Sequence, residues 1–149
     1  MYDMKKYLIM FVVAMMATLS ASADKYTINR ENLPEAAREM LDEYFPKAKV
    51  GMIKVDRHLL KKTDYDVKLV NGTKIEFDNS GKWTSVDCKT REVPEGLVMK
   101  AIRTYVKKNF ADVKIVKIVK KTTSFEITLS DGVGLKFSRL GQFKGVIDI

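Results

Sequence analysis

The chain of 149 residues repeats one pattern after an interval of sixty positions. Residues 66–77 read Asp-Val-Lys-Leu-Val-Asn-Gly-Thr-Lys-Ile-Glu-Phe, and residues 126–137 read Glu-Ile-Thr-Leu-Ser-Asp-Gly-Val-Gly-Leu-Lys-Phe. Leu33-Pro34-Glu35 returns at the same interval as Val93-Pro94-Glu95. Similarity at a fixed interval indicates one supersecondary unit used twice. It predicts an α+β fold built by tandem duplication, with repeats at about 32–90 and 92–149 inside one domain, 24–149.

Each repeat is expected to begin with a helix. Asn32, followed by Pro34 and Glu35, is typical of a capped helix start, and Pro46 should end that helix. In the second repeat, apolar residues recur at helical spacing from Leu97 to Phe110. Pro94 lies 16 positions before Phe110, whereas Pro34 lies 11 before Phe45. The second helix is therefore expected to be five residues longer than the first.

Four antiparallel strands are expected after each helix. Residues 50–55 and 115–119 are β-branched runs, and the segments 65–69, 73–77, 125–129 and 133–137 alternate apolar and polar residues. Asn71-Gly72 and Asp131-Gly132 favour type I′ hairpin turns, in which both residues have positive φ. Further turns lead to last strands at Trp83 and Phe143. The result should be one sheet with the helices on one face.

Alternation also assigns side chains to the two faces of that sheet. Those expected under the helices are Tyr65, Val67, Leu69, Ile75, Phe77, Phe125, Ile127, Leu129, Leu135 and Phe137. Those expected on the open face are Asp66, Lys68, Val70, Lys74, Glu76, Glu126, Thr128, Lys136 and Lys144. The open face is either a solvated surface or the place where a partner binds.

The first 23 residues have the pattern of a secretory signal peptide. Lys5 and Lys6 precede an apolar run at 7–17, and Ala21-Ser22-Ala23 fits a signal-peptidase site. The run is shorter than the roughly 20 residues that a membrane span needs. We expect cleavage before Asp24, no membrane span, and a periplasmic or secreted protein; an uncleaved N-terminal helix is the alternative.

The composition is poor in catalytic and metal-binding side chains. His58 and Cys88 are the only residues of their types, which argues against a His-rich metal site, a thiolate cluster and an internal disulfide. Nothing in the sequence orients them as a thiol–imidazole pair. Cys88 is expected to be a buried small hydrophobe rather than a reactive thiol. We predict no catalytic residue, no metal, no cofactor and no enzymatic activity.

Positive charge is concentrated in the second repeat. Residues 24–93 hold 14 Lys and Arg against 13 Asp and Glu, whereas residues 94–149 hold 11 against 5. A basic patch is expected from Lys100, Arg103, Lys107, Lys114, Lys117 and Lys120. It suggests, as an alternative function, weak electrostatic binding of an anionic envelope surface or glycan. Nucleic acid is not an expected partner, because the aromatic residues fall mostly on core-facing positions of an exported chain.

The loop 57–63 has no counterpart in the second repeat. It carries His58 and two leucines, Leu59 and Leu60. It could fold back onto the core or be offered to a partner.

The repeated pattern of an aromatic, an apolar position, Leu, a turn Gly and a final aromatic resembles the PepSY-like, or β-lactamase-inhibitor-like, family of small exported Bacteroidetes proteins. The matching residues are Tyr65, Leu69, Gly72, Phe77, Gly81 and Trp83, then Phe125, Leu129, Gly132, Phe137, Gly141 and Phe143. The resemblance covers about residues 32–149. It implies one continuous, concave eight-stranded surface, which in the namesake inhibitor grips an enzyme.

The chain lacks the disulfides of that inhibitor, so inhibition of a lactamase in particular does not follow from the resemblance. The resulting prediction is a non-enzymatic binding module. Its open sheet face would engage a protein or peptide in the cell envelope, with inhibition as one consequence.

Overall fold

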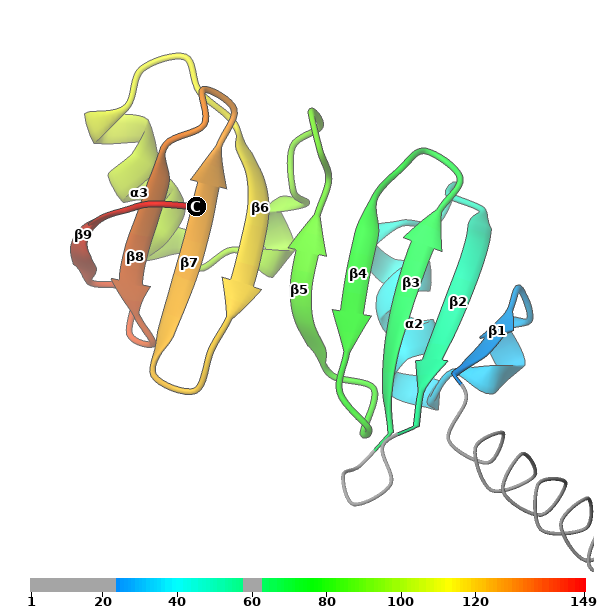
Figure 1. The fold of residues 1–149 in the computed structure, drawn as a ribbon. Coiled ribbons are helices and arrows are strands. Elements are labelled where there is room, and N and C mark those ends of the chain that lie inside the picture. Colours follow the sequence, from blue (N-terminus) through cyan, green and yellow to red (C-terminus); the bar gives the residue numbers. More distant parts are fainter. Residues whose placement is uncertain (1–23, 58–62) are drawn as a thin grey trace, which may run out of the picture.

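The computed structural model describes residues 24–57 and 63–149, which form one antiparallel sheet and two α-helices (Figure 1). The expected signal peptide and His58 lie outside the described residues. The sheet has nine strands in the order β1 to β9, so every strand pairs with its neighbour in sequence. Within the described ranges, no helix is long and apolar enough to cross a membrane.

The element order runs through a helix and four strands twice. After the edge strand β1 (Lys25–Thr27), the first half contains the 3-10 helix η1 (Arg30–Asn32), α2 (Glu35–Tyr44), β2 (Val50–Asp56), β3 (Asp64–Leu69), β4 (Lys74–Phe77) and β5 (Trp83–Asp87). The second half contains the 3-10 helix η2 (Glu95–Leu97), α3 (Lys100–Asn109), β6 (Ile115–Lys120), β7 (Ser124–Leu129), β8 (Gly134–Ser138) and β9 (Phe143–Ile147). Strand β1 was not expected from the sequence and makes the sheet nine-stranded rather than eight-stranded.

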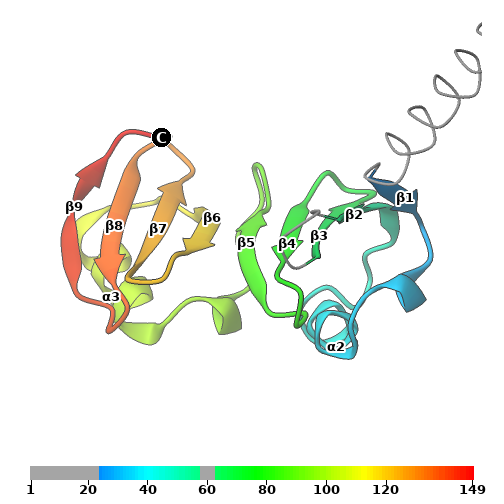
Figure 2. The same cartoon turned by 60° about the horizontal axis from the view of Figure 1, so that its bottom comes forward.

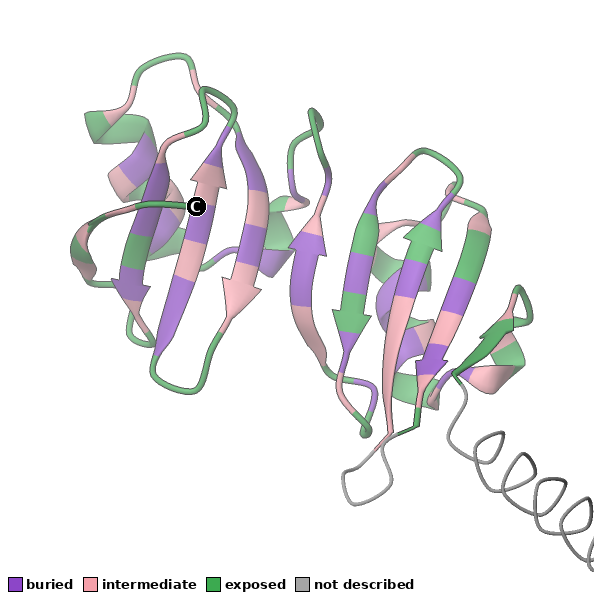
Figure 3. Cartoon of the chain, in the orientation of Figure 1, coloured by how far each residue is buried: buried purple, intermediate pink, exposed green. Residues whose placement is uncertain are grey.

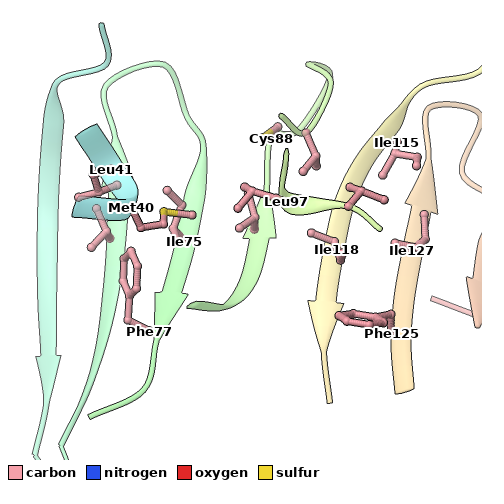
Figure 4. Packing of buried hydrophobic residues seen from close by; sticks show 14 of the residues in the cluster. Met40, Leu41, Ile75, Phe77, Cys88, Leu97, Ile115, Ile118, Phe125 and Ile127 are labelled. Atoms are coloured by element: carbon pink, nitrogen blue, oxygen red, sulfur yellow. The ribbon is translucent and has the colours of Figure 1, made fainter. Parts of the chain in front are cut away.

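Both α-helices lie on the same face of the sheet (Figure 2). Figure 3 shows buried and more exposed bands alternating along the central strands, as the period-two pattern predicts. Nine of the ten residues expected under the helices are buried, and Tyr65 is half-buried. Met40 and Leu41 of α2 lie beside Ile75 and Phe77 of β4 in this core (Figure 4).

The core is one continuous cluster that crosses the boundary between the halves. At this boundary β5 pairs with β6, and Val86 stands opposite Ile118. Both side chains are fully buried. The two halves therefore share a single hydrophobic core across the described residues.

The prediction of a longer second helix was wrong. Both α2 and α3 contain 10 residues, and the N-cap residues are Pro34 and Met99. Pro94 instead precedes the short helix η2, so the Leu-Pro-Glu and Val-Pro-Glu triplets occupy different places in their halves. Asn32 is the last residue of η1 rather than the cap of α2. The two halves are offset by 65 positions through the helices, because the C-cap residues are Phe45 and Phe110.

The offset returns to sixty at the connection that follows the first long strand of each half. Nine residues separate the paired residues Val55 and Tyr65, whereas four separate Lys120 and Phe125. The five extra residues of the first half therefore lie in the β2–β3 connection. The sequence correctly predicted that the first half has five extra residues in this connection. It wrongly predicted that the second half has five extra residues in its α-helix.

The hairpin turns at Asn71-Gly72 and Asp131-Gly132 are not of type I′. Only the glycines have positive φ, +95° and +90°, whereas type I′ requires it at both central residues. Gly72 N donates to Leu69 O at 3.0 Å and Leu69 N donates to Thr73 O at 2.8 Å, a type I turn closed by a left-handed glycine. The Asn71 side chain accepts a hydrogen bond from Thr73 N instead of needing a left-handed backbone.

Candidate binding face

The sheet face opposite α2 and α3, here called the open face, carries two rows of side chains that cross the sheet. The strand register places each residue beside its partner on the next strand. The first row is Tyr26, Lys54, Asp66, Glu76, Ser85, Val119, Glu126, Lys136 and Gly145. The second row is Met52, Lys68, Lys74, Asp87, Lys117, Thr128, Gly134 and Ile147.

The first row is acidic in the first half of the chain. Lys54 Nζ lies 3.1 Å from Asp56 Oδ1 and 3.4 Å from Asp24 Oδ2, and these carboxylates raise the pKa of Lys54. Partial burial opposes ionisation of Asp56, but hydrogen bonds from Lys54 and Asp66 hold its pKa below the usual value. Partial burial, the hydrogen bond to Asp56 and the charge of Glu76 raise the pKa of Asp66 to about 6. Asp66 is thus the carboxyl of this group that holds a proton most readily.

The second row is basic in the first half. Lys68 stands directly opposite Lys74 on the next strand, and both side chains are exposed. Neither has an ion-pair partner among the residues that the structure describes. By contrast, Asp87 in the same row is bound by Lys89 at 3.1 Å. Like charges directly opposite one another in a sheet are destabilising, so this pair is a cost to the fold.

A hollow of about 250 Å³ lies between these lysines and the acidic row. Met52, Lys68 and Lys74 line one end, and Lys54, Asp66 and Glu76 line the other. Met52 is 41% exposed despite its apolar side chain. The open face of the first half therefore offers two lysines that form no ion pair among the described residues, one apolar side chain and an acidic border, with Asp87 opposite Lys74.

The structure brings together six of the eight residues predicted for partner binding. Lys68, Lys74, Glu76, Glu126, Thr128 and Lys136 lie on the two rows. Val70 does not, because it lies in the β3–β4 turn, where it lines a separate hollow with Tyr44 and Phe45. Lys144 lies at the irregular pairing between β8 and β9 on the sheet edge.

Sequence reasoning missed several residues of the open face. Met52 and Lys54 belong to it because they alternate with the buried Ile53 and Val55 on β2. The same period-two pattern, applied to residues 50–56, could have found them. Asp87 enters the second row opposite Lys74 and Val119 enters the first row opposite Glu126, and the β5–β6 pairing, which the sequence did not specify, joins the rows of the two halves.

The six residues predicted as a basic patch do not form one surface. Lys100, Arg103 and Lys107 lie on α3 and line a hollow of about 530 Å³ that also contains Glu92, Glu95 and Asp112. Arg103 Nη1 lies 3.7 Å from Glu95 Oε2, so this arginine is paired with one of those acids. Lys117 lies on the open face, on the other side of the sheet from α3, and Lys114 just precedes β6.

Lys120 is directed toward the helix side of the sheet. Its ammonium lies 4.3 Å from the centre of the Trp83 ring, and the two residues line a hollow with α2. Partial burial and the neighbouring charge of Arg139 lower its pKa. Strand alternation separates Lys117 from Lys120 because side chains an odd number of residues apart point to opposite faces.

No group of three or more His, Cys, Asp or Glu side chains among the described residues is placed to hold a metal ion. Cys88 is a free, buried thiol, and burial raises its pKa to about 11. A thiol in this state is a poor nucleophile at neutral pH.

Comparisons with solved structures give close relatives of the same fold. A putative periplasmic protein of unknown function from Bacteroides vulgatus is 38% identical, with a TM-score of 0.81 over 85% of this chain and 100% of that chain. A protein from Bacteroides thetaiotaomicron, described as a putative calcium-regulated periplasmic protein, is 32% identical, with a TM-score of 0.78 over 84% of this chain and 97% of that chain. A DUF2874-family protein from Bacteroides vulgatus is 35% identical, with a TM-score of 0.78 over 86% of this chain and 99% of that chain.

No curated protein matches the chain. A protein family described as "putative beta-lactamase-inhibitor-like, PepSY-like" matches residues 63–145. The match runs from β3 to Gly145 within β9 and includes most of both rows of the open face. The chain belongs to the PepSY-like, β-lactamase-inhibitor-like family.

Proposed function

We propose that this protein is an exported, non-enzymatic binding module whose open face engages a protein or peptide of the cell envelope. Restraint of an enzyme partner is one form that such binding takes in β-lactamase-inhibitor-like proteins. The description of the solved relatives as periplasmic and the pattern of residues 1–23 support export after cleavage of a signal peptide. The recurring helix-and-four-strand order supports a duplicated ancestral unit.

The observation that carries the proposal is the lysine pair Lys68 and Lys74. Most of the helix face of the sheet is covered by the core, so it offers less strand surface than the open face. The open face instead keeps two ammonium groups opposite each other, without a carboxylate partner among the described residues. A solvated face gains nothing from such an arrangement, whereas an anionic group of a partner would neutralise it.

Photo-crosslinking from opposite layers of the molecule tests which face binds. A photoreactive amino acid replaces Glu76 on the open face in one variant and Glu39 on α2 in the other. Both are exposed glutamates of the first half, so charge change and local environment are matched. Each purified variant is irradiated in an envelope extract of the native organism. We expect a discrete crosslinked product from the Glu76 position alone.

The proposal is wrong if the Glu39 position captures the same product equally well, or if it alone gives a product. No product from either position under matched irradiation also counts against it. Circular dichroism of both variants verifies that the fold is intact, so that a negative result refers to binding.

Electrostatic attachment to an anionic surface is the second candidate, favoured by the excess of 11 basic over 5 acidic residues in 94–149. The dispersal of the six basic residues and the acids beside α3 weigh against it. Sedimentation with vesicles of anionic phospholipid separates the two ideas. Diffuse attraction is screened beyond about 8 Å at physiological ionic strength, so it should disappear in half-molar salt.

Calcium regulation, which belongs to the description of one relative, is not carried over to this chain. The side chains that come nearest to a set of calcium ligands are the carboxylates around Asp56 and Asp66. They are not placed to hold a metal ion, and the hydrogen bond between the two carboxyls favours a bound proton. The donor arrangement therefore does not fit a calcium site.

A further inference from the structure

The hollow beside Lys68 and Lys74 has a counterpart in the second half that the chain itself fills. Gly134 stands opposite Thr128 there, as Lys74 stands opposite Lys68 sixty positions earlier. The C-terminal residues lie against Gly134: a Cβ at that position would come 2.7 Å from Ile147 O and 3.1 Å from Ile149 Cγ2. Figures 1 and 2 show the C-terminus beside β7, on the face of the sheet away from α3.

This internal contact shows what kind of segment the open face accommodates. The segment is Ile147-Asp148-Ile149, in which Ile147 ends β9 opposite Gly134 and Asp148 lies between two apolar residues. Gly134 has no side chain, and this absence lets the segment approach the sheet. Within the second half, Ile147 and Ile149 therefore cover the open face at Gly134.

The first half has the same place but, among the described residues, no segment over it. After β5 the chain stays beside β6 rather than crossing the open face, since Cys88 N donates to Val116 O at 2.8 Å. The hollow of about 250 Å³ is left beside β2, β3 and β4. Lys74 occupies the position equivalent to Gly134. Where the glycine of the second half lets the chain pack against the sheet, the first half therefore has a positively charged side chain.

The side chains around this hollow are complementary to an acidic segment. Lys68 and Lys74 present two ammonium groups without carboxylate partners in the part of the chain that the structure describes. Met52 follows Lys68 in the same row and presents an exposed apolar surface. The acids Asp66 and Glu76 lie two residues along the strands, about 7 Å away, and would repel a second carboxylate on that side.

We propose that the hollow of Met52, Lys68 and Lys74 binds an extended acidic peptide segment of the partner. A carboxylate of the segment lies between the two lysines, and an apolar side chain packs against Met52. The proposal rests on the proposed function of the open face and specifies the chemistry of what that face recognises. Because the attraction is between charges at an exposed site, binding weakens as salt is added.

A nuclear magnetic resonance titration of the ¹⁵N-labelled domain 24–149 tests this chemistry. The acidic probe is the peptide Gly-Val-Ile-Asp-Ile with a free C-terminus, and the basic probe is Gly-Val-Ile-Lys-Ile with an amidated C-terminus. We expect saturable shifts of the Met52, Lys68 and Lys74 amides with the acidic probe, and no saturable shifts with the basic probe. The natural contact of residues 147–149 with Gly134 should remain unperturbed.

Charge-reversal variants locate the interaction. The double variant Lys68→Glu with Lys74→Glu should lose at least about tenfold in affinity for the acidic probe, an effect of about 1.4 kcal/mol. The control reverses the same number of charges away from the open face, by Lys47→Glu in the connection between α2 and β2 with Lys108→Glu on α3; both lysines are exposed. The control should retain the wild-type affinity.

Three outcomes overturn the inference: equal shifts from both probes, shifts centred on Thr128 and Gly134 or on α3, and equal loss in both double variants. The absence of saturable shifts with the acidic probe overturns it as well. These outcomes leave the crosslinking result at Glu76 untouched, so they separate a wrong ligand chemistry from a wrong binding face.

Discussion

Asp66 illustrates, at the scale of single residues, how the strand register sets the electrostatics of the open face. It stands between Lys54 on β2 and Glu76 on β4. Lys54 is held by Asp56 and Asp24, so Asp66 faces mainly other carboxyls. Partial burial and these neighbours raise its pKa to about 6, and the ionised form of Asp66 therefore destabilises the fold.

The substitution Asp66→Asn should stabilise the protein at pH 7 and above. The folded-state pKa, about 6, is higher than the unfolded value of about 3.9, so the folded state binds more protons between these values. Wild-type stability from this group therefore falls as the pH rises from about 4 to 6, and remains lower above that window. Because Asp66 is only partly buried, solvent screening reduces the expected gain to about 1 kcal/mol.

Urea unfolding at pH 5 and at pH 8 measures this effect. The difference in unfolding free energy between Asp66→Asn and wild type should be larger at pH 8 than at pH 5. A difference that is equal at the two pH values, or larger at pH 5, would contradict a raised pKa for Asp66.

Single residues also show where the sequence was sufficient and where it was not. Alternation placed Lys68 and Lys74 on the open face, because the face of a strand residue depends only on its local position. Lys117 and Lys120 were grouped with α3 because they are close in the sequence and share a charge. Their separation onto opposite faces follows from the same alternation, and their neighbours follow only from long-range strand pairing.

At the scale of elements, the β4–β5 turn fixes the start of α2. Gly81 has φ of +87°, and a Cβ there would come 2.8 Å from Pro34 Cβ and 2.9 Å from Ala37 N. In the second half Gly141 lies in the same way against Ala101, near Met99. These contacts make Pro34 and Met99 equivalent, although their side chains are unlike.

Gly81→Ala should cost about 3 kcal/mol of unfolding free energy, since a strained left-handed backbone, about 1–2 kcal/mol, adds to a clash with helix atoms. Gly72→Ala provides the matched control. Gly72 also has positive φ, +95°, but a Cβ added there would meet no atom within 4 Å. It should therefore cost only the backbone strain, about 1–2 kcal/mol.

Chemical denaturation of the two variants gives the comparison directly. Equal losses for Gly81→Ala and Gly72→Ala would mean that the turn does not position α2. A larger loss for Gly72→Ala would contradict the contact geometry outright.

Element boundaries were less predictable than element types. The strands were found because alternation is a local signal, but the helix register was misplaced by the resemblance of Leu33-Pro34 to Val93-Pro94. Proline fits the start of a 3-10 helix as well as that of an α-helix, so the triplet could not distinguish η2 from α3. The turn type was also predicted wrongly. Asn-Gly is compatible with a type I′ turn and with a type I turn closed by a left-handed glycine, and here only Gly72 adopts positive φ.

At the scale of the whole molecule, the two halves are joined by the β5–β6 pairing and by one core. Val86 and Ile118 are fully buried across this junction. The halves differ in what lies on their open faces: the C-terminal residues contact Gly134 in the second, and the lysine pair borders a hollow in the first. The common fold is thus combined with an asymmetric surface.

A shared core predicts that both halves unfold together. Trp83, the only tryptophan, reports on the first half. A variant with Trp83→Phe and Phe143→Trp moves the probe to the second half, where Phe143 stacks on Tyr105 with ring centres 4.5 Å apart. Each fluorescence transition should coincide with the far-ultraviolet circular dichroism transition of the same protein. Two separated transitions in either protein would mean that the halves are independent.

A partner that binds the open face of the first half would cover Lys68 and Lys74. Lysine acetylation with mass-spectrometric readout tests this binding most directly, with and without envelope extract of the native organism. Lys68 and Lys74 on the open face, and Lys100 and Lys107 on α3, are all exposed in the free protein. We expect the extract to protect Lys68 and Lys74 while Lys100 and Lys107 stay reactive; protection of the α3 lysines alone, or equal reactivity at all four with and without extract, would contradict binding at this face.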